Sequence, residues 1–501
     1  MTEQVPMIRC GNEARPYAEV AGRTARIASG LRGLGVKPEG RVGLLMYNDI
    51  SFIEVIGAAS LIGAASVPFN WHLRPNEVRY LVENSEASVI FVHTPLLAVA
   101  REAAPDRILV EVAIPGIAPQ GDALLFEEWL AEQAPYAAPP ESAPLSVIYT
   151  SGTTGSPKGV LREPISPDHQ LQVAGLVVQT LAMKPGHRTL VVAPMYHSAP
   201  NAQAAFAAKM GLDITIMPRF DAEEMLALIE RQRINHVQLV PTHFVRLLAL
   251  PAEVRARYDL SSLEAIVHAA APCPPQVKQQ IIDWLGPIVH EFYGGTETGA
   301  VVASTSAEWL AHPGTVGKPM FDASVRILDP DRQPLPAGES GEIFVKPPSF
   351  WPDFTFIGDP DKRARMDFEG HVSIGDIGYL DSDGFLYLND RAIDMVISGG
   401  VNIYPTEIEN ALLSHDGVRD AAVFGIPDAD LGEKLVAHID VDPDAGLDED
   451  AIRRYLGEQL AKFKVPRVIV FDDKLPREAS GKLMKRRIRQ RYLDAMSTSP
   501  S

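Results

Sequence analysis

Short apolar runs alternate with helix-patterned segments over most of the chain. The runs at residues 41–46, 88–92, 214–217 and 237–240 have the length and composition of buried strands. Between such runs lie segments, residues 17–34 among them, that carry apolar side chains at helical spacing. Strands that alternate with helices predict parallel sheets covered by helices. We therefore expect an α/β fold whose large N-terminal region holds two parallel-sheet subdomains.

The pattern changes from residue 324 onward. Short strands separated by turns, at residues 325–328, 341–345, 371–374 and 385–388, predict a small antiparallel sheet or β-barrel. Helices and strands then mix toward the C-terminus, which is typical of a small α+β domain. The predicted organisation is a large N-terminal domain at residues 1–390, a C-terminal domain at residues 395–501 and a hinge near residues 390–394.

The composition limits the classes of partner and the compartment. A chain of 501 residues needs more than one core, and 46% hydrophobic with 22% charged residues is a globular composition. A formal net charge of −18 argues against general binding to nucleic acid or to anionic membranes. Cys10 and Cys273, the two cysteines, form neither a metal motif nor a disulfide framework. With no leader or membrane span in the sequence, we expect a cytoplasmic protein.

A loop rich in glycine and hydroxyl side chains follows the apolar run at residues 145–149. Its sequence from residue 149 to residue 159 is Tyr-Thr-Ser-Gly-Thr-Thr-Gly-Ser-Pro-Lys-Gly. Glycines let the backbone approach a ligand, successive N–H groups can surround an anion, and Lys158 adds a positive charge. The loop differs from a Walker loop because Pro157 precedes Lys158 and Gly159 follows it. We interpret it as a polyphosphate loop rather than a flexible linker.

A second glycine-rich segment follows another predicted strand. Residues 293–299 read Tyr-Gly-Gly-Thr-Glu-Thr-Gly. Tyr293 could stack on a planar base, Thr296 could donate to a phosphate, and Glu297 could hold Mg²⁺ through its oxygens. By itself the segment could equally be a surface turn with a solvated glutamate. Ligands of open α/β sheets bind beyond the carboxyl ends of the strands, so both loops should open onto one crevice.

These two segments, with others in the same order along the chain, resemble the adenylate-forming superfamily and its AMP-dependent acyl-CoA synthetases. The resemblance covers nearly the whole chain. It implies that a carboxylic acid reacts with ATP and Mg²⁺ to give an acyl-adenylate and pyrophosphate. Coenzyme A then attacks the adenylate to give acyl-CoA and AMP. The resemblance also implies that the C-terminal domain is a mobile lid that rotates between the two steps. We expect the small-molecule acid and CoA as partners and no binding to nucleic acid. The sequence does not decide between a monomer and a homodimer.

The resemblance assigns roles to individual residues of this sequence. Lys482, in a Pro-x-x-x-x-x-Lys tail that begins at Pro476, matches the adenylation lysine, and His197 matches a histidine beside the acyl site. Glu297 with Thr150 would hold Mg²⁺. A packed core histidine remains an alternative for His197. The remaining nucleotide and CoA positions implied by the resemblance are Thr150, Ser151, Gly152, Thr153, Thr154, Lys158, Ala270, Ala271, Pro272, Tyr293, Gly294, Thr296, Asp376, Arg391, Gly399 and Gly400.

The sequence departs from the family pattern at the hinge. Ile393 stands two residues after Arg391, where many relatives have Lys or Asp, so the hinge position is the least specific of these assignments.

The identity of the acid rests on a candidate pocket that mixes small apolar residues with histidines. An apolar lining suits a hydrophobic acid, and the histidines favour a polar ring substituent or are simply packed. We favour an aromatic or cyclic acid over a medium- or long-chain fatty acid. An enzyme that passes the adenylate to a carrier protein is the other alternative. The pocket residues are Met195, Tyr196, His197, Ala202, Val240, His243, His268, Ala269 and Gly294.

Overall fold

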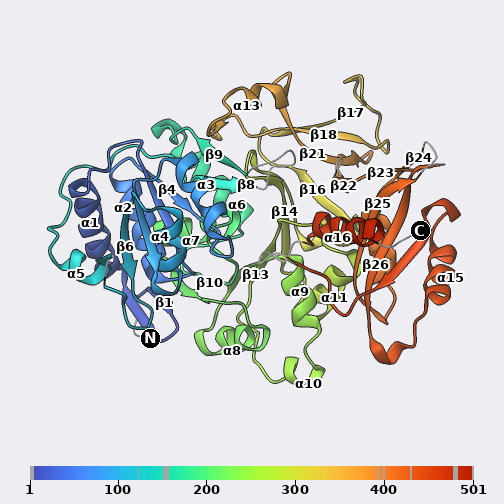
Figure 1. The fold of residues 1–501 in the computed structure, drawn as a ribbon, viewed down its shortest axis with the longest axis horizontal. Helices are drawn as coiled ribbons and strands as arrows, with labels where there is room; N and C mark the ends of the chain where they lie inside the picture. The colour runs from blue at the N-terminus through green and yellow to red at the C-terminus, as the bar shows by residue number, and fades with distance from the viewer. Residues whose placement is uncertain are drawn as a thin grey trace.

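The computed structural model describes residues 5–121, 123–150, 157–391, 394–398, 401–428, 431–477 and 483–498. Figure 1 shows an elongated arrangement along the direction of the sequence. The N-terminal sheet and its helices lie at one end, the middle of the chain forms the centre, and the C-terminal domain lies at the other end. The predicted α/β fold class, with a separate C-terminal α+β domain, is confirmed.

The first subdomain is built on a sheet whose described strands are all parallel and lie in the order β4-β3-β5-β6-β7. The inner strands β3 and β5 and the strand β4 are buried on both faces, as expected for a parallel sheet covered by helices, whereas β6 and β7 are exposed at Ile108 and Leu124. The strands are β3 (Arg41–Leu45), β4 (Ala65–Pro68), β5 (Val89–His93), β6 (Ile108–Val112) and β7 (Leu124–Leu125). The helices are α1 (Tyr17–Gly33), α2 (Ile50–Leu61), α3 (Pro75–Ser85), α4 (Leu97–Ala103) and α5 (Phe126–Ala131).

Residues 55–69 are largely apolar but contain Gly, Ser and Pro, and they form the end of α2 followed by β4. Asp49 caps α2 by accepting a hydrogen bond from the Ile50 N–H at 2.6 Å. α2 packs against both α1 and α7 (Ser198–Lys209), so it is buried over much of its circumference. Among the described residues, no helix combines the length and the apolar character that a bilayer crossing requires.

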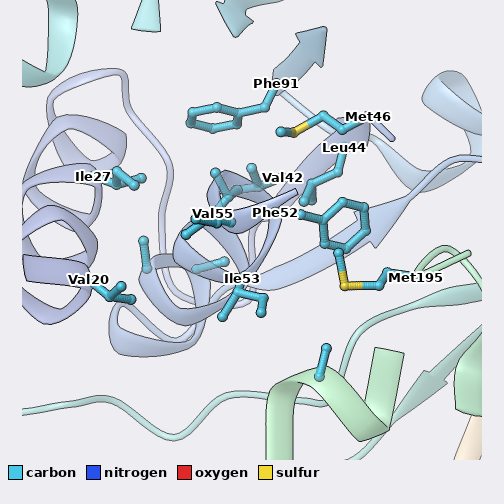
Figure 2. Close-up of a cluster of buried hydrophobic side chains, with 14 of the residues drawn as sticks. Val20, Ile27, Val42, Leu44, Met46, Phe52, Ile53, Val55, Phe91 and Met195 are labelled. Carbon is cyan, nitrogen blue, oxygen red and sulfur yellow. The ribbon is translucent and has the colours of Figure 1, made fainter. Parts of the chain in front are cut away.

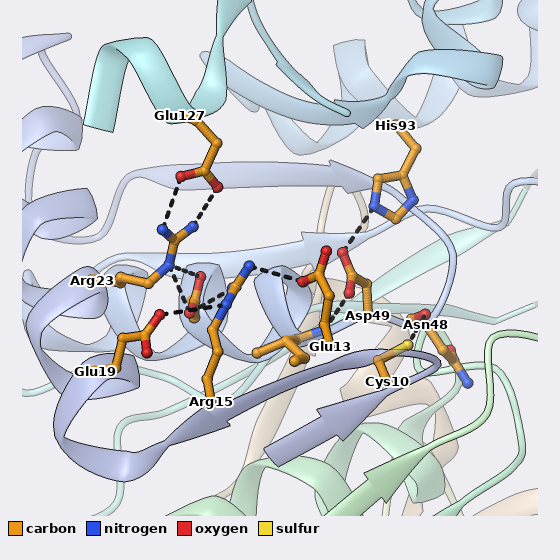
Figure 3. Close-up of polar contacts among 11 residues, drawn as sticks. Cys10, Glu13, Arg15, Glu19, Arg23, Asn48, Asp49, His93 and Glu127 are labelled. Atoms are coloured by element: carbon orange, nitrogen blue, oxygen red, sulfur yellow. Dashed lines mark hydrogen bonds and ion pairs between the residues drawn. The ribbon is translucent and has the colours of Figure 1, made fainter. Parts of the chain in front are cut away.

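A buried glutamate ties three helical segments of this subdomain together. Glu54 on α2 is fully buried and accepts from Arg15 at 2.9 Å and from Arg23 at 3.0 Å. Figure 3 shows the two arginines together with Glu127. Arg23 also donates to Glu127 of α5 at 2.6 Å. Burial raises the pKa of Glu54, and the two arginines oppose that rise. Because a buried carboxylate needs paired donors, Arg23 fixes α1 and, through Glu127, α5 on α2, while Arg15 brings the strand Glu13–Pro16 to the same carboxylate.

The second subdomain and the antiparallel region share one sheet. The described strands lie in the order β17-β18-β21-β22-β16-β15-β14-β13-β12-β10-β11-β1-β2, with β20 beside β21. Its parallel part contains β1 (Met7–Cys10), β10 (Arg188–Val191), β11 (Asp213–Ile216), β12 (His236–Leu239), β13 (Ala265–His268) and β14 (Val289–Gly295). Its antiparallel part contains β2 (Glu13–Pro16), β15 (Gly299–Ser304), β16 (Thr315–Pro319), β17 (Ser324–Leu328), β18 (Gly341–Lys346), β20 (Asp367–Phe368), β21 (His371–Leu380) and β22 (Leu386–Arg391).

The transition within this sheet occurs at β14. This strand pairs in parallel with β13 and antiparallel with β15, because residues 295–299 reverse the chain in a tight turn rather than through a helix. The strands predicted as a small β-barrel therefore continue the second sheet, and among the described strands they do not close on themselves. The helices of this region are α6 (Gln170–Thr180), α7 (Ser198–Lys209), α8 (Ala222–Gln232), α9 (Pro241–Leu248), α10 (Ala252–Arg255), α11 (Pro275–Leu285), α12 (Ser306–Ala311) and α13 (Asp361–Met366).

A small antiparallel sheet lies between the two large ones. It pairs β8 (Ile148–Thr150) with β9 (Lys158–Arg162) and β9 with β19 (Phe354–Phe356). β8 and β9 form the two sides of a hairpin whose connection is the predicted phosphate loop. Residues 151–156 of that loop lie outside the described residues. The hairpin places Thr150 opposite Lys158, so both ends of the loop have defined positions.

The C-terminal domain has its own core. Its sheet contains β23 (Val396–Ser398), β24 (Val401–Ile403), β25 (Val418–Asp428), β26 (Gly432–Val441) and β27 (Val468–Phe471). α14 (Pro405–Leu413) and α15 (Glu449–Gln459) pack on one apolar cluster, and α16 (Lys485–Thr498) packs on another. Both clusters consist of residues from Val396 onward, so this part of the chain buries its own apolar side chains, as a domain does.

Candidate active site

One large cleft collects the predicted nucleotide-binding segments. Its volume is about 2390 Å³, and it is bordered by both N-terminal subdomains, the antiparallel strands and the C-terminal domain. Segments that are far apart in the sequence meet here because β8, β13 and β14 all end at this cleft. The lining contains Thr150, Tyr196, His197, Val240, Ala269, Ala270, Ala271, Pro272, Tyr293, Gly294, Thr296, Glu297 and Asp376.

The two residues expected to hold Mg²⁺ lie side by side. The Thr150 hydroxyl at the end of β8 is 3.5 Å from the Glu297 carboxylate in the turn between β14 and β15. A hydroxyl and a carboxylate are hard oxygen ligands, and Mg²⁺ commonly takes one or two protein carboxylates together with substrate phosphates. The donor set therefore fits Mg²⁺ held jointly with a polyphosphate. A cage of three or more His, Cys, Asp or Glu is not found in the part of the chain that the structure describes.

Arg162, which sequence reasoning missed, holds the turn that carries Glu297. Its guanidinium is buried and donates to the carbonyls of Thr296 at 2.6 Å, of Glu297 at 2.9 Å and of Pro352 at 3.0 Å. Burial lowers the pKa of Arg162 to about 10, so it stays protonated at neutral pH. The Trp351 ring lies 5.1 Å from it. A single arginine in an apolar strand, Lys158–Arg162, gave no signal of this role in the sequence.

The predicted base-stacking tyrosine and ribose carboxylate are bonded to each other. The Tyr293 hydroxyl donates to the Asp376 carboxylate at 2.9 Å, and both side chains are buried in the wall of the cleft. Arg391 is the backbone partner of Asp376 across β21 and β22. This contact orients Asp376 before any ligand binds. It also fixes the distance between the aromatic ring and the carboxylate, as recognition of a nucleoside requires.

The stretch Ala270-Ala271-Pro272 follows β13 and lines the same cleft. Ala270 has φ = +77°, a left-handed conformation that costs energy for any residue with a Cβ. Small side chains here leave room for a flat group against the backbone. The strained backbone of Ala270 marks this turn as a position that the surrounding structure holds in place.

Lys158 begins β9 and faces a carboxylate. Its ammonium is 3.6 Å from Asp359, which also accepts from Arg365 at 2.8 Å. The two cations lower the pKa of Asp359, Arg365 contributing more than Lys158. Lys158 thus has a counter-ion next to the loop that it is expected to serve, but Lys158 itself is not part of the lining of the cleft, which here includes Pro157 and Arg365.

Three members of the predicted acid pocket lie beneath the lining of the cleft. Met195 is fully buried in the first core, near Phe52 (Figure 2). His243 stacks on Phe220 with ring centroids 4.1 Å apart, and burial lowers its pKa to about 3. His268 is fully buried, which lowers its pKa well below the usual range. Both histidines are therefore neutral at physiological pH. Of the two roles considered for them, packing in the core rather than contact with the acid fits their buried positions.

A buried ion pair lies under the Ala269–Pro272 stretch. Lys278 on α11 donates to Glu291 on β14 at 2.6 Å, and both side chains are buried. The Nε2 atom of His268 is 3.5 Å from the same carboxylate. Glu291 also contributes to the lining of the cleft. The pair connects α11 to β14, and His268 of β13 lies close to the same carboxylate. The turn expected to contact adenine lies between these two strands. The sequence analysis did not predict this pair.

Several predicted positions lie outside the described residues. These are Ser151, Gly152, Thr153 and Thr154 of the phosphate loop, Gly399 and Gly400 of the expected CoA segment, Lys482, and Ile393 of the expected hinge. The neighbours of Lys482 that are described do border the cleft, among them Arg477, Leu483 and Met484. Arg477 pairs with Asp420 at 2.6 Å, which anchors this end of the tail to β25.

Comparison with known proteins identifies the family. The model of the AMP-binding enzyme family matches residues 3–352, and that of the AMP-binding enzyme C-terminal domain matches residues 407–482. The chain belongs to the AMP-binding enzyme family. Feruloyl-CoA synthase from Amycolatopsis sp is 33% identical over 98% of this chain and 97% of that protein. Indoleacetate–CoA ligase from Aromatoleum aromaticum is 33% identical over 95% and 92%.

A solved structure of the same superfamily has the same fold. The structure of o-succinylbenzoate CoA synthetase from Bacillus subtilis, in complex with its acyl-adenylate intermediate, aligns with a TM-score of 0.83 at 26% identity. The alignment covers 98% of this chain and 96% of that one. The proposed hinge near residues 390–394 falls between the two ranges that the family models match, and it stays a prediction.

Proposed function

We propose that this protein is an AMP-forming acid–thiol ligase that converts an aromatic carboxylic acid, ATP and CoA to aryl-CoA, AMP and pyrophosphate through an acyl-adenylate. One observation carries the proposal: Thr150, Glu297, Tyr293 and Asp376 meet in a single cleft although they come from three separate segments. The family and the named relatives support the same reaction.

The residues of the cleft divide the work of adenylation. Glu297 and Thr150 would hold Mg²⁺, whose charge offsets that of the phosphates. Tyr293 and the Ala270–Pro272 turn would enclose the adenine, and Asp376 would accept hydrogen bonds from the ribose hydroxyls. Arg162 keeps Glu297 in place by bonding to the backbone on both sides of it. Catalysis of phosphoryl and adenylyl transfer depends mainly on positioning and charge stabilisation, which this arrangement provides.

We further propose that Lys482 bridges the acid carboxylate and the α-phosphate during adenylation, and that the C-terminal domain then turns to present Gly399 and Gly400 to the pantetheine arm of CoA. Support comes from the sequence motif and from the residues beside Lys482, which border the cleft. His197 at the N-terminus of α7 would lie against the acid. Separate orientations for the two half-reactions would let one cleft serve both.

The aromatic substrate class rests on the lining of the acid pocket and on the relatives. Val240, Ala269, Ala202 and Gly294 give small, apolar walls, and Tyr196 adds an aromatic one. The relatives named for feruloyl and indoleacetate act on aromatic acids. A fatty acid and a carrier-protein acceptor, the two alternatives considered from sequence, are less favoured on these grounds.

The test is the release of pyrophosphate and AMP with MgATP, with and without CoA, across hydroxybenzoates, cinnamates, arylacetates and fatty acids. We expect CoA-dependent AMP release with an aromatic acid and little with unsubstituted fatty acids. Release of pyrophosphate without CoA-dependent release of AMP would indicate that the acyl group passes to an acceptor other than CoA. A preference for fatty acids would overturn the aromatic assignment but leave the ligase reaction in place.

A further inference from the structure

The cleft extends beyond the predicted nucleotide site into a groove between helices. α7 contributes Ala202, Ala205, Phe206 and Lys209 to its lining, at the spacing of one helix face. α1, α2 and α6 each contribute a stripe with the same periodicity, and these stripes are mostly apolar or small. The groove is therefore walled by four helices along the length of α7.

One end of this groove lies at the reaction centre. α7 begins at Ser198, whose hydroxyl is 3.3 Å from that of Thr296, and His197 precedes it. The other end lies at Lys209, the last residue of α7. With a rise of 1.5 Å per residue, the two ends are about 16 Å apart along the helix axis. The groove is longer than a single aromatic ring requires.

Lys209 is a cation without a counter-ion at the far end. Lys209 is exposed and belongs to the lining of the cleft, its ammonium lies 5.4 Å from the Phe206 ring, and among the described residues no carboxylate pairs with it. Partial desolvation by the surrounding protein atoms lowers the pKa of Lys209, and no neighbouring charge opposes this. Glu141, which also lines the cleft, is already paired with Arg32 and accepts from Tyr136. An apolar occupant alone would leave the ammonium desolvated and unpaired, which is costly.

We propose that the acid substrate is elongated, with an apolar body that lies along α7 and a second anionic group, such as a distal carboxylate, that binds Lys209. This inference rests on the proposed function and narrows its substrate class to aryl or alkyl-aryl dicarboxylic acids. Lys209 would then determine specificity without touching the reacting carboxyl group. Side chains of a helix point toward its N-terminus, so the ammonium of Lys209 lies closer to the reaction centre than its Cα does. The two anionic groups of the acid can therefore be closer together than the full length of α7.

The test compares matched acids on matched variants. The acids are aryl carboxylates with linkers of increasing length that end either in a carboxylate or in a methyl group. The variants are Lys209→Ala, Lys209→Arg, Lys209→Glu and, as a control, Lys37→Ala at an exposed site away from the groove. Initial rates of AMP release give kcat/KM for each pair, and calorimetry measures binding of the same acids directly.

For linkers of the right length we expect the wild type to prefer the dicarboxylate. Lys209→Ala should reduce that preference roughly tenfold or more, mainly through KM, because a charge-assisted hydrogen bond is lost. Lys209→Arg should retain it, and Lys209→Glu should reverse it in favour of the methyl-ended acids because the glutamate repels the distal carboxylate. Lys37→Ala should leave it unchanged.

An unchanged preference in Lys209→Ala, or a wild type that prefers the methyl-ended acids at every length, would overturn the inference. Ala205→Phe gives an independent check because its ring would fill the middle of the groove, so long acids should be lost and short ones retained. If no acid supports AMP release, the proposed function fails. Calorimetric binding of the dicarboxylate that depends on Lys209 would still support the groove assignment in that case, and its absence would overturn it.

Discussion

At the scale of single residues, the site depends on side chains whose burial makes their hydrogen bonds strong. Arg162 satisfies three backbone carbonyls, and Tyr293 satisfies one oxygen of Asp376. A buried polar group that loses its partner costs about 1–3 kcal/mol, more than the net gain of an ordinary hydrogen bond. Substitutions at these positions should therefore affect nucleotide binding more than their conservative character indicates.

Replacing Arg162 with lysine should weaken MgATP binding and destabilise the fold. A lysine cannot span the carbonyls of Thr296, Glu297 and Pro352 at once, so the turn that carries Glu297 loses its anchor. We expect kcat/KM for ATP to fall by at least about tenfold and stability by about 3 kcal/mol. Pyrophosphate release and urea unfolding measure the two effects. Arg363→Lys, on exposed partners, is the control, and equal effects of the two substitutions would contradict the assigned role.

Replacing Tyr293 with phenylalanine should raise KM for ATP and change kcat less. The ring remains available to the base, but the hydroxyl no longer orients Asp376. We expect a rise of about five- to tenfold, in the range of one buried hydrogen bond. Asp376→Asn should have the larger effect because it also removes the charge that accepts from ribose. Steady-state kinetics with ATP as the varied substrate test the order of the two variants.

Stability should decrease as the pH falls from about 6.5 toward 3 because of buried histidines. Burial lowers the pKa of His243 and of His236 to about 3, whereas the unfolded chain takes up these protons near 6.5. Since the unfolded state binds more protons in this window, each histidine costs about 2 kcal/mol between pH 7 and pH 5. His243→Phe should remove its share of this slope in urea unfolding. Leu171→Ala, at an exposed site that binds no proton, is the control and should leave the slope unchanged.

At the scale of elements, the arrangement depends on close contact between strands where the parallel and antiparallel parts of the sheet join. Gly317 on β16 has φ = +111°, and a Cβ there would lie 1.9 Å from the Ala303 carbonyl of β15. The position therefore admits only glycine. This contact holds β16 against β15, the strand that follows the Glu297 turn, so it supports the geometry of the cleft from behind.

Gly317→Ala should destabilise the protein by more than 3 kcal/mol, because the new methyl group collides with backbone that cannot move away. Gly338→Ala is the matched control: its φ is +87°, but a Cβ would meet nothing within 4 Å. The control should cost only about 1 kcal/mol through backbone strain alone. Urea unfolding of both variants separates collision from strain, and similar losses would show that the close contact is unimportant.

At the scale of the whole molecule, function depends on how the C-terminal domain meets the cleft. Its core is separate from those of the N-terminal region, and residues of α14, β25 and the tail before α16 border the cleft. Domains with separate cores can change their relative orientation without unfolding. A two-step reaction that needs different groups at different times is compatible with such an arrangement.

Lys482→Ala should abolish adenylate formation and leave thioester formation from pre-made acyl-adenylate largely intact. The lysine is expected to stabilise charge only in the first step, while CoA enters in the second. Acid-dependent pyrophosphate release and conversion of synthetic acyl-adenylate with CoA measure the two steps separately. Lys474→Ala, at an exposed position, is the control. Loss of both half-reactions in Lys482→Ala would refute this division.

Much of the fold could be predicted from the sequence because it follows from local patterns. The helical stripe of Tyr17–Gly33 and the strand before the phosphate loop were both predicted by apolar periodicity. The predicted β-barrel is replaced in the structure by a continuation of the second sheet, whose described strands do not close. The prediction was wrong on this point because periodicity indicates strands but not which strands pair. Arg162 and the Lys278–Glu291 pair were missed for a related reason: a charged residue next to apolar ones gives no sign of the partner it will reach.

By itself the sequence determined the fold class, the order of the motifs and the family, since each depends on residues that are close together in the chain. Only the tertiary structure decided that Thr150 lies 3.5 Å from Glu297, that Tyr293 bonds to Asp376, and that Met195, His243 and His268 lie beneath the cleft rather than in its lining. The physical reason is that direction and burial depend on packing between elements. A side chain's period along the chain specifies the face it occupies, whereas the neighbouring elements decide whether that face meets a ligand or a core.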